Sequence, residues 1–247
     1  RDALLDLSLF KVGTFSWGNL TAATVAIGEF SLMFVLPLFL VNSMGLSTLT
    51  TGVVLAGMAL GAFGSGASAR HLAARLTAPG VVVLGLALEV IGVAALAWVV
   101  AAQASVWLVV ATLVVYGVGL GLASAQLTST VLGDIPEELS GAGSATQSTV
   151  RQLGSALGAA IAGSALGVAM ARTIPATGVP AELAQATESS AGSAITALRE
   201  TAGASAEIIS SLEAGFAQSA AWSIGFSALF LVLGLVGSFM VLRASRR

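Results

Sequence analysis

The sequence predicts an all-α transmembrane protein, a bundle of six membrane-spanning helices. Of its 247 residues, 56% are hydrophobic and only 9% are charged, and the mean hydropathy is +0.96, well above that of ordinary soluble domains. Six apolar segments are long enough to cross about 30 Å of hydrocarbon at about 1.5 Å per residue. The alternating pattern of membrane strands is absent, and helices satisfy their own backbone groups in lipid. We place the spans near residues 14–40, 49–69, 79–101, 105–132, 147–171 and 216–242.

The first three spans follow one another through short connections. The first span carries Glu29 and leads through an outer turn, residues 42–48, into the second. A basic turn over residues 70–77 connects the second span to the third, which carries Glu89.

The fourth and fifth spans are rich in glycine and surround a short charged turn, residues 133–141. Helices in lipid associate through close packing, so pairs of small residues four positions apart indicate a helix that another backbone approaches. The fifth span is therefore predicted to be a packing helix through two such pairs, Gly154/Gly158 and Gly163/Gly167.

The long connection before the sixth span, residues 172–215, is rich in Ala, Ser, Thr and Glu. We interpret it as a solvated outer spacer in preference to an acidic vestibule that concentrates cations. Apolar residues at helical spacing predict short amphipathic helices within it: Ile195, Leu198 and Ala202, then Ile208, Ile209 and Leu212.

Basic residues fall mainly on one side of the predicted spans. Only Arg172 and Arg199 lie on the other side, and the excess of Lys and Arg marks the cytoplasm. Both termini are therefore predicted to be cytoplasmic, together with the cations Arg1, Lys11, Arg70, Arg75, Arg151, Arg243, Arg246 and Arg247.

Several motifs share a pattern with one transporter family. The most specific is Thr149-x-Arg151-Gln152-Leu153-Gly154-x-x-x-Gly158, and it follows Gly117-x-Gly119-x-Gly121-Leu122, Asp134-x-Pro136 and Gly141. The end of the first span, Leu36-Pro37-Leu38-Phe39-Leu40, fits as well, although Val41 and Thr48 depart from the pattern. The chain resembles the C-terminal half of a major facilitator superfamily transporter, from the fourteen-helix drug/proton antiporter branch.

This resemblance implies a fold and a function. Residues 1–247 would form one half of a major facilitator fold, cut from a longer polypeptide whose N-terminal half is missing. The whole protein would be a proton-coupled exporter of small amphipathic or cationic molecules such as drugs, in the plasma membrane of a bacterium. Its partners would be the lipid bilayer, the missing half, its substrate and protons, with no nucleic acid. Alternatives are a facilitator permease for another small solute, a membrane scaffold and a membrane-embedded enzyme.

The inventory of reactive side chains argues against an enzyme. The chain has no Cys and a single His, His71, so thiolate catalysis, disulfides and multi-ligand His/Cys metal sites are excluded. We expect no catalytic residue, no cofactor and no metal, and we interpret His71 as an interfacial residue.

Two acidic residues are predicted at mid-membrane depth, Glu29 and Glu89. A central charge costs about 2.5–3.5 kcal/mol on insertion scales, so such residues usually face a cavity or a partner and often handle protons or ions. Both are candidates for proton or cation coupling. We favour Glu29 because the resemblance places its span at the central cavity, whereas the span of Glu89 would be peripheral. The alternative for each is a carboxyl bonded to a neighbouring helix.

Other polar residues suggest a cavity wall and a gate. Tyr116 and Gln126 recur with small residues on one face of the fourth span, and Asn19 is a weaker candidate in the first. They are candidate substrate-cavity residues, with polar contacts between helices as the alternative. At the cytoplasmic end, Arg151 and Gln152 would start the fifth span, where an acid must offset the arginine. Asp134, Arg151 and Gln152 are candidates for a cytoplasmic gate whose contacts break as the two halves of a transporter rock. A static anchor at the membrane interface is an equally good interpretation of these residues.

Overall fold

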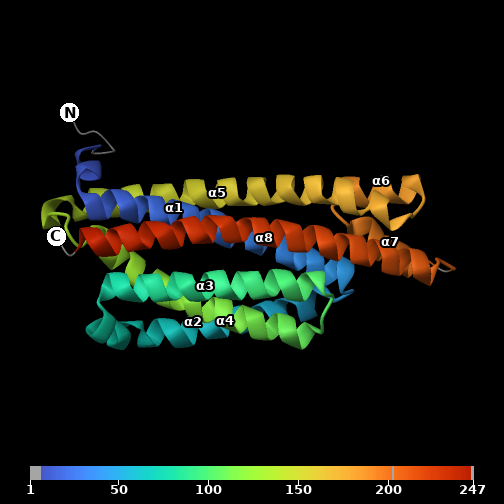
Figure 1. The fold of residues 1–247 in the computed structure, drawn as a ribbon, viewed down its shortest axis with the longest axis horizontal. Coiled ribbons are helices and arrows are strands. Elements are labelled where there is room, and N and C mark those ends of the chain that lie inside the picture. The colour runs from blue at the N-terminus through green and yellow to red at the C-terminus, as the bar shows by residue number, and fades with distance from the viewer. Residues whose placement is uncertain (1–6, 202, 246–247) are drawn as a thin grey trace.

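Six helices of the computed structural model are long and apolar enough to cross a membrane, and Figure 1 shows them running side by side. The structure describes residues 7–201 and 203–245, and no strand occurs among them. The predicted fold class, an all-α six-helix transmembrane bundle, is confirmed. The long helices are α1 (Gly13–Leu38, continued by a π-helical turn, Phe39–Ser43), α2 (Thr48–Leu76), α3 (Ala78–Ala101), α4 (Val106–Leu132), α5 (Ser140–Thr173) and α8 (Ala206–Ala244).

The helices pack in a layered order. In Figure 1, α5 lies at the top, α1 and α8 lie in the middle, and α3, α4 and α2 lie below. Helix α1 packs against α5 and α8, α3 joins α8 to α4, and α2 packs against α4. Two short helices, α6 (Ala181–Ser189) and α7 (Ser193–Glu200), cover one end of the bundle. The start of α1 and the end of α8 lie at the opposite end, as an even number of spans requires.

Several helices extend beyond the predicted apolar spans. The predicted basic turn over residues 70–77 is wrong, because α2 continues to Leu76 and Thr77 alone reverses the chain. Its backbone has φ +66°, and its Oγ1 accepts a hydrogen bond from the Gly80 amide at 3.4 Å. Residues 70–76 include no helix breaker, whereas Pro79 suits the first turn of α3. The helix therefore ends where the backbone must turn and not where charges begin.

The last two long helices also begin earlier than predicted. A single 3-10 turn, Glu137–Leu139, follows Pro136 and leads directly into α5 at Ser140. Helix α7 confirms a short helix around Ile195, but the second predicted one, around Ile208, is the start of α8. Ala202 lies outside the described residues.

The first predicted glycine pair of the fifth span makes a close helix contact. A Cβ atom at Gly154 would lie 2.7 Å from the Ala23 carbonyl oxygen, and one at Gly158 would lie 2.5 Å from that of Ile27. Ser31 adds a hydrogen bond at 2.9 Å from its Oγ to the Gly158 carbonyl. The backbones of α1 and α5 touch here because neither glycine has a side chain.

The second glycine pair forms no such contact within this chain. A Cβ atom at Gly163 would lie 3.6 Å from the Phe34 ring, and one at Gly167 would meet nothing within 4 Å. The prediction of a close approach at this pair is therefore wrong for the six-helix unit.

A matched comparison of Gly158→Val on α5 with Gly225→Val on α8 tests the close contact between α1 and α5. We expect Gly158→Val to destabilise the full-length protein by about 1–3 kcal/mol, because its side chain would collide with the backbone of α1. A Cβ atom at Gly225 would meet nothing within 4 Å, so Gly225→Val is expected to change stability little. Thermal unfolding of the detergent-solubilised protein measures both, and equal midpoints would contradict the close contact.

Candidate functional site

A charged pair links α1 to α5 near the glycine contact. Glu29 lies near the middle of α1 and is 7% exposed. The Nη2 atom of Arg151 lies 3.8 Å from Glu29 Oε2, which is an electrostatic contact and too long for a hydrogen bond. Arg151 precedes Gly154 by less than one helical turn, so the close approach of α5 to α1 brings the guanidinium to the carboxyl.

A second carboxyl group lies between α3 and α4. Glu89 is fully buried, and neither of its carboxyl oxygens has a hydrogen-bond partner. A Cβ atom at Gly119 would lie 2.6 Å from the Glu89 backbone nitrogen, so the glycine lets α4 pass directly over this residue. Glu89 interacts electrostatically with both Glu29 and Arg151. We call Glu29, Glu89 and Arg151 the carboxyl cluster.

The carboxyl cluster has an unequal charge count. It contains two groups that can carry a negative charge and a single guanidinium. When both carboxyls are ionised, the cluster needs one further positive charge to be neutral, and an uncompensated buried charge is costly. A proton or the positive charge of a bound molecule can supply that charge.

The three predicted cavity residues are placed differently from one another. Asn19 is 2% exposed and donates to the Phe15 carbonyl at 2.9 Å, while its Oδ1 has no partner. Tyr116 is 1% exposed, packs against Gly92 and interacts electrostatically with both carboxyls of the cluster. Gln126 instead lines a pocket of about 340 Å³ with Arg70 and His71. Tyr116 therefore belongs with the carboxyl cluster, and Gln126 with the end of α2.

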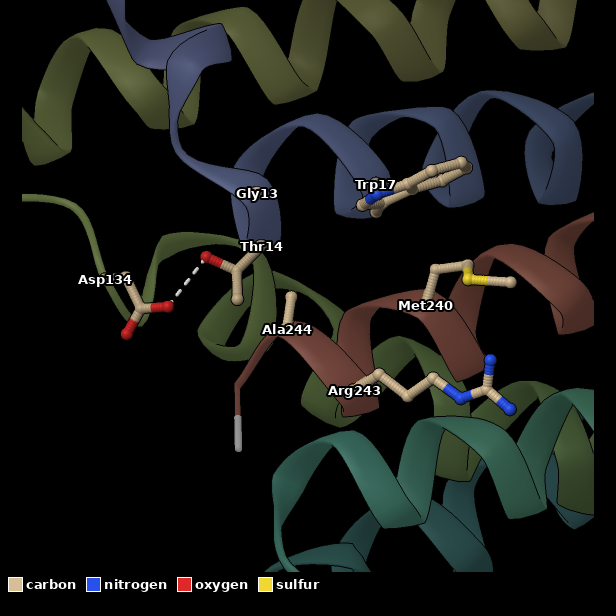
Figure 2. Close-up of a pocket in the computed structure, with 7 residues that line it drawn as sticks. All are labelled: Gly13, Thr14, Trp17, Asp134, Met240, Arg243 and Ala244. Carbon is tan, nitrogen blue, oxygen red and sulfur yellow. Dashed lines mark hydrogen bonds between the residues drawn. The ribbon is translucent and has the colours of Figure 1, made fainter. Parts of the chain in front are cut away.

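The predicted gate residues also separate. The Thr14 hydroxyl donates to Asp134 Oδ2 at 2.8 Å, which holds the turn after α4 against the start of α1 (Figure 2). Both residues line a pocket of about 470 Å³ together with Trp17, Met240 and Arg243. Asp134 thus contacts α1 and forms no ion pair with Arg151.

The expectation that an acid of this turn offsets Arg151 is corrected by the structure, because Arg151 faces Glu29. Arg151 was expected in the first turn of the fifth helix, but α5 begins at Ser140, about 16 Å earlier along the helix axis. The dipole of the helix start therefore does not govern Arg151. Gln152 is exposed beside it on α5.

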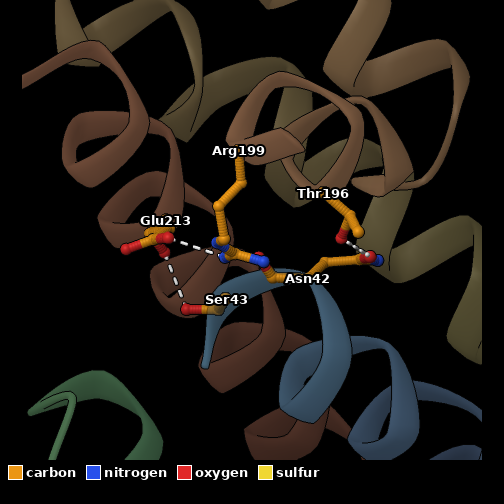
Figure 3. A network of polar contacts seen from close by, with 5 residues as sticks. All are labelled: Asn42, Ser43, Thr196, Arg199 and Glu213. Atoms are coloured by element: carbon orange, nitrogen blue, oxygen red, sulfur yellow. Dashed lines mark hydrogen bonds and ion pairs between the residues drawn. The ribbon is translucent and has the colours of Figure 1, made fainter. Parts of the chain in front are cut away.

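The opposite end of the bundle holds a polar network that we did not predict (Figure 3). Arg199 of α7 pairs with Glu213 of α8 at 2.6 Å and donates to the Asn42 carbonyl at 3.0 Å. The Thr196 hydroxyl donates to Asn42 Oδ1 at 3.2 Å, and the Ser43 hydroxyl donates to the Glu213 carbonyl at 3.0 Å. The network joins the end of α1 to α7 and α8, more than 150 residues later in the sequence, so no local sequence pattern predicts it.

This network is expected to hold α7 over the π-helical end of α1. Arg199→Ala removes the ion pair and the bond to Asn42 together, and it leaves the partly exposed Glu213 without its cation. We expect earlier protease cleavage within residues 178–205 in the full-length protein, with the six long helices still folded. Arg172→Ala is the control, because Arg172 takes part in neither of the two ion pairs among the described residues, which use Arg151 and Arg199. Equal cleavage of both variants would show that the network does not hold the segment.

Comparison with known proteins gives a family match over most of the chain. A family model described as Major Facilitator Superfamily matches residues 3–159. Multidrug resistance protein MdtD of Pectobacterium carotovorum is 31% identical over 166 residues, which is 67% of this chain and 35% of that protein. Multidrug efflux pump LfrA of Mycolicibacterium smegmatis is 28% identical over 216 residues, 86% of this chain and 42% of that protein. Riboflavin transporter RibZ of Clostridioides difficile is 28% identical over 160 residues, 65% of this chain and 35% of that protein. The chain thus spans less than half the length of these relatives.

Proposed function

This chain belongs to the Major Facilitator Superfamily, and we propose that it is the C-terminal half of a proton-coupled exporter of small amphipathic or cationic molecules. Its six apolar helices make it part of an integral membrane protein. The family and the multidrug relatives support drug-like substrates and a bacterial plasma membrane. In this proposal, both ends of the segment face the cytoplasm.

Two helices present surfaces suited to the missing half. Helices α2 and α5 are the least buried of the six spans. Gly64 of α2 and Gly167 of α5 each face open space within this chain. Such small residues allow close helix approach in a membrane, and transporters of this kind work by rocking two halves around a site between them. These faces support contact with an N-terminal half.

The carboxyl cluster is the observation that carries the coupling proposal. Glu29 faces Arg151 and Glu89 has no hydrogen-bond partner, so in this proposal the cluster takes one further positive charge, either a proton or a cationic substrate. The side chain of Glu29 is 10% exposed and that of Arg151 is 37% exposed, so a substrate reaches this side of the cluster. Glu89 is fully buried and is reached only by a proton. Mutual exclusion of proton and substrate is what an antiporter needs.

The riboflavin transporter relative favours a second candidate, a facilitator permease for another solute. A facilitator equilibrates its substrate and needs no charge exchange, so the carboxyl cluster would then be a structural contact between helices. The two candidates differ in whether a proton gradient drives accumulation.

Flux through the full-length protein in proteoliposomes tests the proposal. With a proton gradient imposed, an exporter moves a fluorescent cationic dye against its concentration gradient, and collapsing the gradient stops the movement. A facilitator gives downhill flux that ignores the proton gradient, and a scaffold gives no flux. Either of these results would overturn the proposed function.

A further inference from the structure

The two halves of α5 are held to the bundle in different ways. The second half is bonded to both neighbouring helices, because the Ser31 hydroxyl of α1 and the Ser223 hydroxyl of α8 donate to carbonyl groups of α5 at 2.9 and 3.3 Å. In the first half, residues 140–153, the polar contact to another long helix among the described residues is that of Arg151 with Glu29, at 3.8 Å. The first half of α5 is therefore tied to the bundle through the carboxyl cluster.

Two buried amide side chains lie between this half of α5 and α1. Asn19 of α1 is 2% exposed and Gln147 of α5 is 3% exposed. A Cβ atom at Gly143 would lie 3.5 Å from the Phe15 ring, and the two amides each follow these residues by four positions, about one helical turn. The helices run in the same direction, since the glycine contacts of α5 described above advance along α1 as well. Asn19 and Gln147 therefore lie at the same level on facing sides.

Neither amide is fully paired in this arrangement. Asn19 Oδ1 and Gln147 Nε2 are buried and have no hydrogen-bond partner among the described residues. A buried donor or acceptor without a partner keeps the full cost of its removal from water. Movement of the first half of α5 away from α1 removes this cost, because both amides then bond to water.

We infer that the first half of α5 moves away from α1 during each transport cycle, with the glycine contact at Gly158 as its pivot. The contact between Arg151 and Glu29 holds this half in place, and the unpaired amides of Asn19 and Gln147 favour its release. When a proton or a substrate cation neutralises Glu29, the contact weakens and the movement follows. The inference rests on the proposed function, because it links the charge of the carboxyl cluster to a change of shape.

The substitution Gln147→Met in the full-length protein tests whether the unpaired amide favours release. Methionine has a similar shape but carries no donor that needs a partner. We expect the thermal midpoint in detergent to rise by about 2–4 °C. Downhill flux of a cationic dye into proteoliposomes should nevertheless fall by about tenfold, which corresponds to about 1.4 kcal/mol of extra stability before the movement. Gln185→Met is the control, since Gln185 is exposed in α6, and it should change neither quantity.

A cross-link between α1 and α5 tests the movement itself. Asn19→Cys and Gln147→Cys are combined in a full-length protein without other cysteines, and residues 1–247 contain none. We expect a short, reducible thiol reagent to join the two positions and to reduce flux by at least about tenfold. A reductant should restore the flux in the same sample.

Four results would overturn the inference: no cross-link, full flux in the cross-linked protein, a lowered thermal midpoint in Gln147→Met, or wild-type flux in that variant. A lowered midpoint would mean that the amide is bonded and holds the helices together. A failure of the proposed function is distinguishable from these results, because it appears as absence of dye flux in the protein without any substitution.

Discussion

Replacing Glu29 with glutamine is expected to reduce proton-driven export by about tenfold or more, while folding and membrane insertion persist. Glutamine preserves the shape of the side chain but carries no negative charge. A unit charge about 4 Å from a carboxylate is attracted by about 4 kcal/mol at an effective dielectric constant near 20. A tenfold change in rate requires only about 1.4 kcal/mol. The variant also leaves Glu89 balanced by Arg151, so the cluster no longer needs a proton or a substrate cation.

Efflux measured against external pH in matched vesicles checks this prediction. Glu89→Gln is the matched control, since Glu89 is fully buried and cannot touch a substrate. It is expected to lower downhill flux less than Glu29→Gln does, although proton-driven accumulation weakens. A wild-type rate and pH dependence in Glu29→Gln, with the loss in Glu89→Gln instead, would show that coupling depends on the other carboxyl.

Replacing Arg151 with glutamine is expected to have the second-largest effect, because it leaves two carboxyls with no cation from the protein itself. The cluster would then take up two positive charges from outside, so a proton and a substrate cation could bind at the same time. The proton would no longer displace the substrate cation from Glu29. We expect tighter binding of a cationic dye and export reduced by about tenfold, from the same charge attraction near 4 Å.

Arg151→Lys separates the charge of this residue from its packing. Lysine keeps the positive charge but not the planar guanidinium, so it should restore part of the export lost in Arg151→Gln. Dye binding and efflux of the two variants are compared in the same vesicles. If lysine and glutamine behave alike, Arg151 acts through its shape and the charge count of the cluster is irrelevant.

The sequence predicted the spans well because length and apolar content determine what crosses a bilayer. It predicted helix ends poorly, because residues 70–76 and 140–146 are less apolar than the spans but contain no proline that would end a helix. Glycine spacing predicted that another helix approaches closely at Gly158, but not that this helix is α1. It could not show that the face around Gly167 stays open, because spacing does not say which surface has a neighbour.

The sequence identified the candidate residues of the site but did not show which of them lie together. The depths of Glu29 and Glu89 could be estimated from their positions within apolar spans. The pairing of Arg151 with Glu29 could not, because it depends on how two helices cross and on where α5 begins. The outer network of Asn42, Arg199 and Glu213 needed the same three-dimensional information.

Substrate-induced proton release tests the central claim most directly. The full-length protein in detergent and weak buffer is mixed with a lipophilic cation, and the released protons are counted with a pH indicator. Because proton and cation compete for the carboxyl cluster, binding should release about one proton per protein, and none in Glu29→Gln. Saturable cation binding by the wild-type protein with no proton release would contradict the account.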